Sequence, residues 1–116
     1  MPRAATTTDV FNAIAEPRRR QLIEVLARRG ALAVGTLVVA VGLPQPAVSK
    51  HLGVLRKVGV VSVDKSGRQR VYRLNAQELK SVYDWVKLFE HFWSHQLDRI
   101  KQRAEEKARA RADTST

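Results

Sequence analysis

The chain has 116 residues, of which 21 are lysine or arginine and 11 are aspartate or glutamate, so its formal net charge is +10. This length suits one domain with a modest core, and the excess positive charge favours a nucleic acid or another anionic partner. Cysteine is absent, which excludes disulfides, thiolate metal sites and thiol redox switches. The sequence shows neither a signal peptide nor a bilayer-spanning apolar run, so we expect a soluble, cytoplasmic protein.

The N-terminal part of the chain predicts three short helices. Residues 1–8 are polar, and we expect them to be disordered. Asp9 can cap the first helix. Pro17 suits the first position of the second helix, which ends at Gly30. A third helix is expected over residues 34–41.

The third helix is unusually apolar near its end. Val39 and Ala40 are poor solubilisers, which suggests extra buried contact. Our interpretation is local packing, against the second helix or beneath the hairpin described below. The alternative is a surface for a partner or a ligand.

The segment 42–58 has the pattern of a DNA-recognition helix. Val48, Leu52 and Leu55 recur at i, i+4 and i+7, so they line one buried face. The remaining positions offer groups that read base edges and grip phosphates. The DNA-contacting candidates in this helix are Gln45, Pro46, Ser49, Lys50, Arg56 and Lys57.

Two alternating β-type runs follow over residues 60–74, around a Lys-Ser-Gly-Arg turn. They predict a β-hairpin with a basic tip. Lys65, Arg68 and Arg70 are expected to enter the minor groove or to touch phosphates. A basic-faced helix followed by a basic hairpin indicates a winged helix-turn-helix, a mainly α fold with a small β-hairpin wing (α+β).

A long apolar stripe then predicts a dimerisation helix over residues 79–100. Asn75 and Glu78 resemble a capping box at its start. The stripe exposes more apolar surface than one small core can cover, which favours pairing with a second copy. The alternative is a helix folded back on its own domain. The interface candidates are Leu79, Val82, Val86, Phe89, Trp93 and Leu97.

The domain organisation follows from these elements. We expect the winged domain and its dimerisation helix to occupy residues 9–100. Residues 101–116 are rich in Ala, Lys, Arg and Glu. They permit a helix but have nothing to pack against, so a fraying basic tail is expected.

The chain resembles the ArsR family of bacterial winged-helix repressors over about residues 9–100. The resemblance lies in Pro-Gln-Pro-Ala-Val-Ser-Lys-His-Leu from Pro44, in Gly-Arg-Gln-Arg-Val-Tyr-Arg-Leu from Gly67, and in Phe-Asn-Ala-Ile-Ala-Glu-Pro from Phe11. It implies a homodimeric repressor of an inverted-repeat DNA operator, with Phe11 on a first helix packed beside the dimerisation helix. It also marks a departure, because relatives often have Ser or Thr where Pro44 stands.

Metal binding and catalysis are not expected. His91, His95 and Asp98 share one helical side, which leaves a metal-responsive repressor as an alternative. The family's zinc-type pattern would need a histidine two residues after Asp84, where this chain has Val86. His51 is interpreted as a packing or hydrogen-bonding residue. No catalytic motif or cofactor site is recognisable, and a low-specificity architectural DNA-binding protein is the other alternative.

Overall fold

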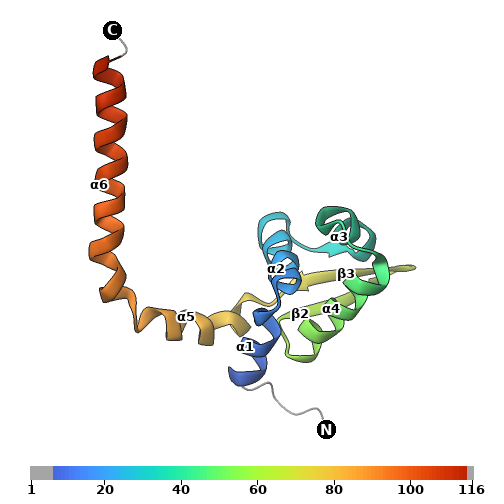
Figure 1. The fold of residues 1–116 in the computed structure, drawn as a ribbon. Coiled ribbons are helices and arrows are strands. Elements are labelled where there is room, and N and C mark those ends of the chain that lie inside the picture. The colour runs from blue at the N-terminus through green and yellow to red at the C-terminus, as the bar shows by residue number, and fades with distance from the viewer. Residues whose placement is uncertain (1–6, 115–116) are drawn as a thin grey trace. The chain divides into compact units, whose positions relative to one another are not determined.

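The computed structural model describes residues 7–114 and is helical apart from one small sheet (Figure 1). The helices are α1 (Thr7–Ala15), α2 (Pro17–Arg29), α3 (Val34–Val41), α4 (Gln45–Lys57), η1 (a 3-10 helix, Ala76–Leu79), α5 (Lys80–Lys87) and α6 (Glu90–Thr114). The strands are β1 (Leu32–Ala33), β2 (Val61–Ser66) and β3 (Gln69–Leu74). The chain forms two units, one ending at Val82 and one beginning at Tyr83, so the expected 9–100 domain extends over both.

The first helix begins earlier than expected. Of the segment 1–8, which we expect to be disordered, residues 1–6 lie outside the described residues. Thr7 and Thr8 belong to α1. Asp9 lies in the first turn of that helix and not at the N-cap position before it. A carboxylate in this position still complements the positive end of the helix dipole.

The boundaries of α2 and α3 are those the sequence predicts. The backbone N–H of Arg19 donates to Glu16 Oε2 (3.0 Å), so the glutamate caps α2, and Pro17 occupies the first turn. The N–H of Gly30 donates to Leu26 O (3.0 Å) at the end of that helix. The third helix runs over residues 34–41, as expected.

The end of α4 is a Schellman motif that leads directly into the sheet. The N–H of Gly59 donates to Arg56 O and that of Val60 to Leu55 O, both at 3.0 Å. Gly59 has φ of 85°, which only glycine adopts at little cost. Gly59 therefore ends the recognition helix, as the sequence predicts.

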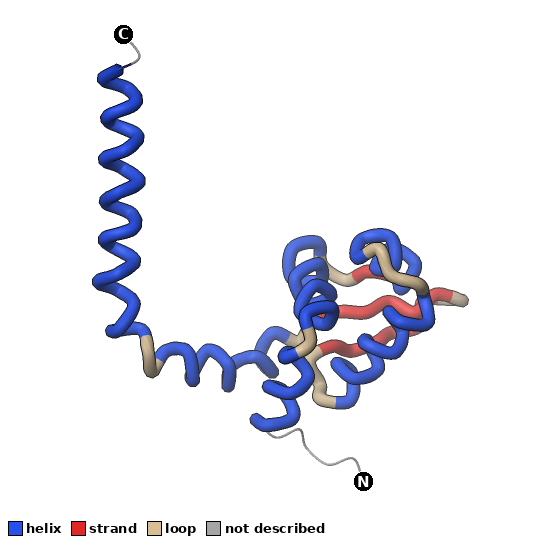
Figure 2. Tube along the Cα trace, in the orientation of Figure 1, coloured by secondary structure: helices blue, strands red, loops and turns tan. Residues whose placement is uncertain are grey.

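The sheet contains a third strand that the sequence did not reveal. Its order is β1-β3-β2, and both pairings are antiparallel (Figure 2). The two-residue turn after Ser66 has Gly67 (φ 63°) at its first central position, which is the arrangement of a type II′ turn. β1 is only two residues long and is defined by the pairing of Leu32 with Tyr72, so no local pattern marks it.

One core holds the helices and the sheet of the first unit together. Val48, Leu52 and Leu55 are fully buried, which confirms the predicted inner face of α4. They pack in a cluster with buried residues of the other elements, namely Val10, Ala13, Leu22, Leu26, Leu37, Val58, Val60, Val61 and Tyr72. Truncating such a leucine to alanine costs about 2–5 kcal/mol, so this cluster fixes the orientation of α4.

Val39 and Ala40 of α3 do not pack locally, although Val41 beside them packs partly against the core. Val39 is 82% exposed, and Ala40 is exposed as well. Our preferred interpretation of these residues was therefore wrong. Leu37 takes the buried face of this short helix, and a helix that presents one face to the core turns Val39 outward.

Asn75 does not form the predicted capping box. Its side chain gives no cap to η1. It donates instead to Gly59 O (2.9 Å) and to Ser62 Oγ (2.6 Å). Asn75 thus joins the end of the hairpin to the glycine after α4, because these long-range acceptors outcompete a local helix cap.

The predicted long helix is interrupted at residues 88–89. The N–H groups of Leu88 and Phe89 donate to Trp85 O (3.2 Å) and Val86 O (3.0 Å), so the backbone tightens to i→i+3 bonds. The Phe89 ring contacts Trp85 edge-on (5.3 Å between centroids) and stacks on Trp93 (6.3 Å). Neither proline nor glycine marks this break, which explains why the sequence missed it.

The second half of α6 is helical where a fraying tail was expected. The helix continues without a break from Glu90 to Thr114. Alanine, lysine, arginine and glutamate are all strong helix formers, which accounts for the continuation. Among residues 7–114, no helix combines the length and apolar character needed to cross a membrane.

Candidate DNA-binding surface

The outer face of α4 carries the residues that the sequence assigns to DNA contact. Gln45, Ser49 and Lys50 are exposed in its first half, and Arg56 and Lys57 are exposed in its last turn. Pro46, another candidate, is also exposed. The opposite face is buried, so the core alone decides that these side chains face outward. Gly53 is exposed too, and a Cβ there would meet nothing within 4 Å.

The start of α4 has no side-chain cap. Pro44 is the N-cap residue, and it makes no side-chain hydrogen bond. A serine or threonine here would satisfy a backbone N–H of the first turn and could also touch a phosphate. Pro44 removes both possibilities, so the polar side chains at the start of α4 are Gln45 in the first turn and Ser49 in the second.

Polar side chains anchor α4 to the beginning of α2. Arg19 Nη1 lies 3.5 Å from His51 Nδ1, and Glu16 Oε2 lies 3.9 Å from the same nitrogen. The guanidinium of Arg19 also donates to Ala13 O, and that of Arg20 to Ile14 O (2.8 Å). His51 is thus a hydrogen-bonding residue, as expected. Arg19 and Arg20 connect the start of α2 to carbonyl groups at the end of α1.

The wing concentrates positive charge in an unfavourable arrangement. Lys65 and Arg70 occupy directly opposite positions on the two strands of the hairpin, and Arg68 lies in the turn between them. All three side chains are exposed. Like charges at directly opposite positions repel each other and destabilise a hairpin. Arg73, by contrast, donates to the carboxylate of Asp64. The wing therefore presents exposed cations whose mutual repulsion a bound anion would relieve.

A pocket lies between the wing and the recognition helix. It has a volume of about 480 Å³, and Gln45, Arg68 and Arg70 line it together. The other lining residues are Ala33, Val34, Gly35, Thr36 and Gln69. The fold thus brings together candidates that are about 25 residues apart. Sequence reasoning missed Thr36 and Gln69, although both are polar and lie beside elements it had identified.

The candidate metal ligands do not gather into a site. His91, His95 and Asp98 lie on α6, where the His91 ring packs against Phe92 (4.0 Å between centroids). Within residues 7–114 no group of three histidine, aspartate or glutamate side chains is close enough to hold a metal ion. Residues at i, i+4 and i+7 of one helix extend over about 10 Å, too far for a common ion without further ligands.

The candidate dimer residues fall into two groups. Leu79 and Val82 pack partly against the core of their own unit. Beyond them the apolar side chains are largely uncovered: Leu88 is 67% exposed and Ile100 is 64% exposed. Val86 and Phe89 are half-buried, Phe11 on α1 is half-buried, and Trp93 and Leu97 are exposed.

Comparison with known proteins agrees with this geometry. A family model described as "Bacterial regulatory protein, arsR family" matches residues 16–63. The chain is 38% identical over 81 residues to the HTH-type transcriptional regulator NmtR of Mycobacterium tuberculosis, covering 70% of this chain and 67% of that protein. It is 30% identical over 78 residues to the transcriptional repressor SdpR of Bacillus subtilis, covering 67% of this chain and 86% of that protein.

Solved structures show the same fold. The crystal structure of a possible transcriptional regulator for arsenical resistance superposes with a TM-score of 0.61 at 37% identity, over 81% of this chain and 94% of that chain. A homodimeric winged helix-turn-helix DNA-binding domain from Mycobacterium bovis, described as a possible ArsR-family regulator, gives a TM-score of 0.60 at 28% identity, over 72% and 79% of the two chains. The chain belongs to the ArsR family and is a winged helix-turn-helix transcriptional regulator.

Proposed function

We propose that the protein is a homodimeric repressor that binds an inverted-repeat DNA operator. The single observation that carries this proposal is the exposed basic surface of α4 and the wing, in which Lys65 lies directly opposite Arg70 and neither forms an ion pair within residues 7–114. A polyanion such as duplex DNA relieves that repulsion. Occupancy of a promoter by the dimer blocks polymerase.

The two parts of this surface have different roles in the proposal. Gln45 and Lys50 lie in the first half of α4, the half that a recognition helix offers to the major groove. Glutamine suits adenine, and lysine suits guanine or a phosphate. Arg68 and Arg70 hold the backbone or the minor groove, and Arg56 and Lys57 hold the backbone at the other end of α4.

The uncovered apolar side chains support dimerisation. Tyr83, Trp85, Leu88, Phe92 and Ile100 are large and more than half exposed on and beside α5 and α6. Exposed apolar surface of this kind marks an interface. The homodimeric state of the Mycobacterium bovis domain supports the same arrangement for this chain. A two-fold dimer then requires half-sites about one helical turn apart, or a multiple of it.

Selection of bound duplexes from random DNA tests the proposal. We expect an inverted repeat, bound about a thousandfold or more tightly than scrambled DNA. Gln45→Ala should relax the preference at one base pair of each half-site and cost about 1–3 kcal/mol on the best site. Gln102→Ala, the same change on α6, is the control and should leave the preference intact. Equal affinity for all duplexes would instead identify an architectural DNA-binding protein.

A further inference from the structure

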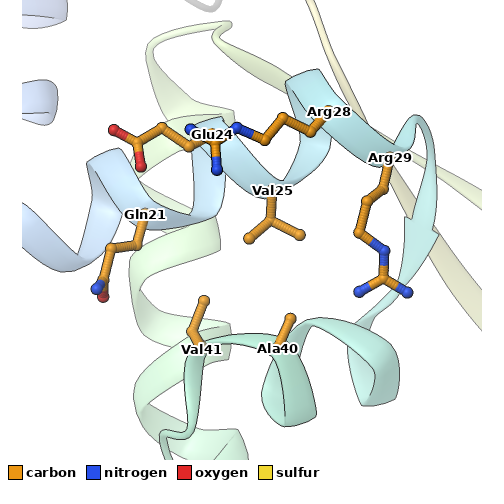
Figure 3. A pocket seen from close by; sticks show the side chains of 7 residues that line it. All are labelled: Gln21, Glu24, Val25, Arg28, Arg29, Ala40 and Val41. Atoms are coloured by element: carbon orange, nitrogen blue, oxygen red, sulfur yellow. The ribbon is translucent and has the colours of Figure 1, made fainter. Parts of the chain in front are cut away.

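A second pocket lies on the surface of the first unit, between α2 and α3, and none of the DNA-contact candidates lines it. Its volume is about 410 Å³ (Figure 3). Known small-molecule sites have volumes of roughly 300–1,000 Å³, so the size of this pocket suits a small ligand. The lining residues are Gln21, Glu24, Val25, Arg28 and Arg29 of α2 and Ala40 and Val41 of α3.

The middle of this α2–α3 pocket is apolar. Val25 points from α2 toward α3, and Ala40 and Val41 point back toward it (Figure 3). Ala40 is exposed, and Val41 and Val25 are only half-buried. Water therefore reaches apolar side chains that an apolar ligand would cover, which is favourable in proportion to the area removed from water.

The two ends of the pocket are polar and different. Arg29 reaches from the end of α2 toward α3 at one end, and Gln21 lies at the other (Figure 3). Among residues 7–114 no ion pair involves Arg29. A guanidinium binds a carboxylate through two parallel hydrogen bonds, a stronger contact than it makes with a neutral acceptor.

The other charged groups of the pocket do not cancel this preference. Glu24 and Arg28 extend sideways along α2, whereas Arg29 extends toward α3 (Figure 3). Glu24 is the one acid among the lining residues, against two arginines. The pocket as a whole is therefore positive. The guanidinium that extends toward α3 is that of Arg29.

We propose that the α2–α3 pocket binds a small carboxylic acid with an apolar body. The carboxylate lies against Arg29, and the apolar body lies among Val25, Ala40 and Val41. An amine of the same skeleton is repelled by the guanidinium, and a neutral alcohol loses the charge-assisted hydrogen bonds.

Such a ligand would act on DNA binding through charge and packing. It neutralises a cation of the DNA-binding unit, and the attraction of that unit for DNA falls with its positive charge. It also lies against α3, which shares the core with α4. We therefore expect the bound acid to lower operator affinity. This consequence depends on the proposed function, whereas binding in the pocket does not.

Phenylacetate, phenethyl alcohol and phenethylamine provide a matched set of probes with negative, zero and positive charge. We expect phenylacetate to bind the full chain saturably, with a dissociation constant in the millimolar range or tighter. Amide resonances around Val25, Arg29 and Ala40 should shift in NMR titrations without DNA. The alcohol should bind about tenfold more weakly, and the amine should not bind.

Substitutions in the α2–α3 pocket test whether phenylacetate binds there. Arg29→Gln should weaken phenylacetate binding about tenfold or more. Ala40→Phe fills the pocket from an exposed position, so it should abolish binding while the fold, checked by circular dichroism, is kept. Arg99→Gln, on α6, makes the same charge change elsewhere and should leave binding unaltered.

Two results would overturn the proposal. One is the absence of saturable binding for phenylacetate and for octanoate, a longer apolar acid. The other is equal loss of binding in Arg29→Gln and Arg99→Gln, which would indicate a general response to net charge. If phenylacetate binds but operator affinity does not change, the effector role is wrong. If operator binding is absent without any acid, the proposed function fails independently of the pocket.

Discussion

The wing hairpin provides a test in which stability and DNA binding should change in opposite directions. Arg70 lies directly opposite Lys65, whereas Arg73, three residues along the same strand, is paired with Asp64. We predict that Arg70→Gln stabilises the folded protein and weakens its binding to DNA. Arg73→Gln, the matched control, should destabilise the protein slightly and leave DNA binding nearly unchanged.

The magnitudes follow from the arrangement of the charges. Directly opposite residues have Cβ atoms about 5 Å apart, and unit charges about 7 Å apart in water, a separation that long side chains allow, repel by about 0.6 kcal/mol. Arg70→Gln should therefore raise the free energy of unfolding by about 0.3–0.6 kcal/mol at low salt. Arg73→Gln removes an exposed ion pair worth about 0.2–1 kcal/mol. The two variants should thus differ by about 1 kcal/mol.

Urea denaturation at low and high salt measures the stability difference, which should nearly vanish at about 1 M salt because the charges are then screened. Titration of operator and scrambled duplexes at several salt concentrations measures DNA binding. For Arg70→Gln the affinity for both duplexes should fall, and the salt slope should decrease by about 0.9 for each phosphate that the variant no longer neutralises. The slope for Arg73→Gln should stay near that of the unaltered protein.

Equal destabilisation by the two substitutions would refute the repulsion between Lys65 and Arg70. An unchanged salt slope in Arg70→Gln would refute the assignment of Arg70 to a phosphate. Because the two readouts are independent, each step of the reasoning can fail separately.

Four further outcomes are expected. Leu97→Asp should convert the dimer to a monomer in light scattering, because it places a charge in the proposed interface, while Gln96→Asp should not; a wild type that is monomeric at micromolar concentration would contradict the dimer. Gly53→Ala should raise the free energy of unfolding by about 1 kcal/mol in urea titrations, because the site is helical and open, and a loss of stability would contradict that geometry. Asn75→Ala should cost about 1–3 kcal/mol, because the carbonyl of Gly59 loses its side-chain donor; a neutral result would mean that water replaces the amide. Operator affinity should not respond to zinc or to chelator, and a tenfold zinc effect that His95→Ala removes would establish a metal sensor.

Local patterns in the sequence determine much of this protein. The spacing of Val48, Leu52 and Leu55 identifies the buried face of α4, and all three are buried. Gly59 marks the end of that helix, and Gly67 marks the hairpin turn, because the backbone conformations there favour glycine. The DNA-contact candidates follow from these local elements, since the residues opposite a buried face must be exposed.

Tertiary structure decides the features that depend on distant partners. β1 exists only through its pairing with β3, and the amide of Asn75 bonds to Gly59 and Ser62 in place of its own helix. The exposure of Val39 and the pocket beside Ala40 depend on how α3 lies against α2. The opposition of Lys65 and Arg70 is set by strand register. A pattern along the chain records the periodicity of one element, whereas these features arise where two elements meet, and the free energy of packing them together determines which residues come into contact.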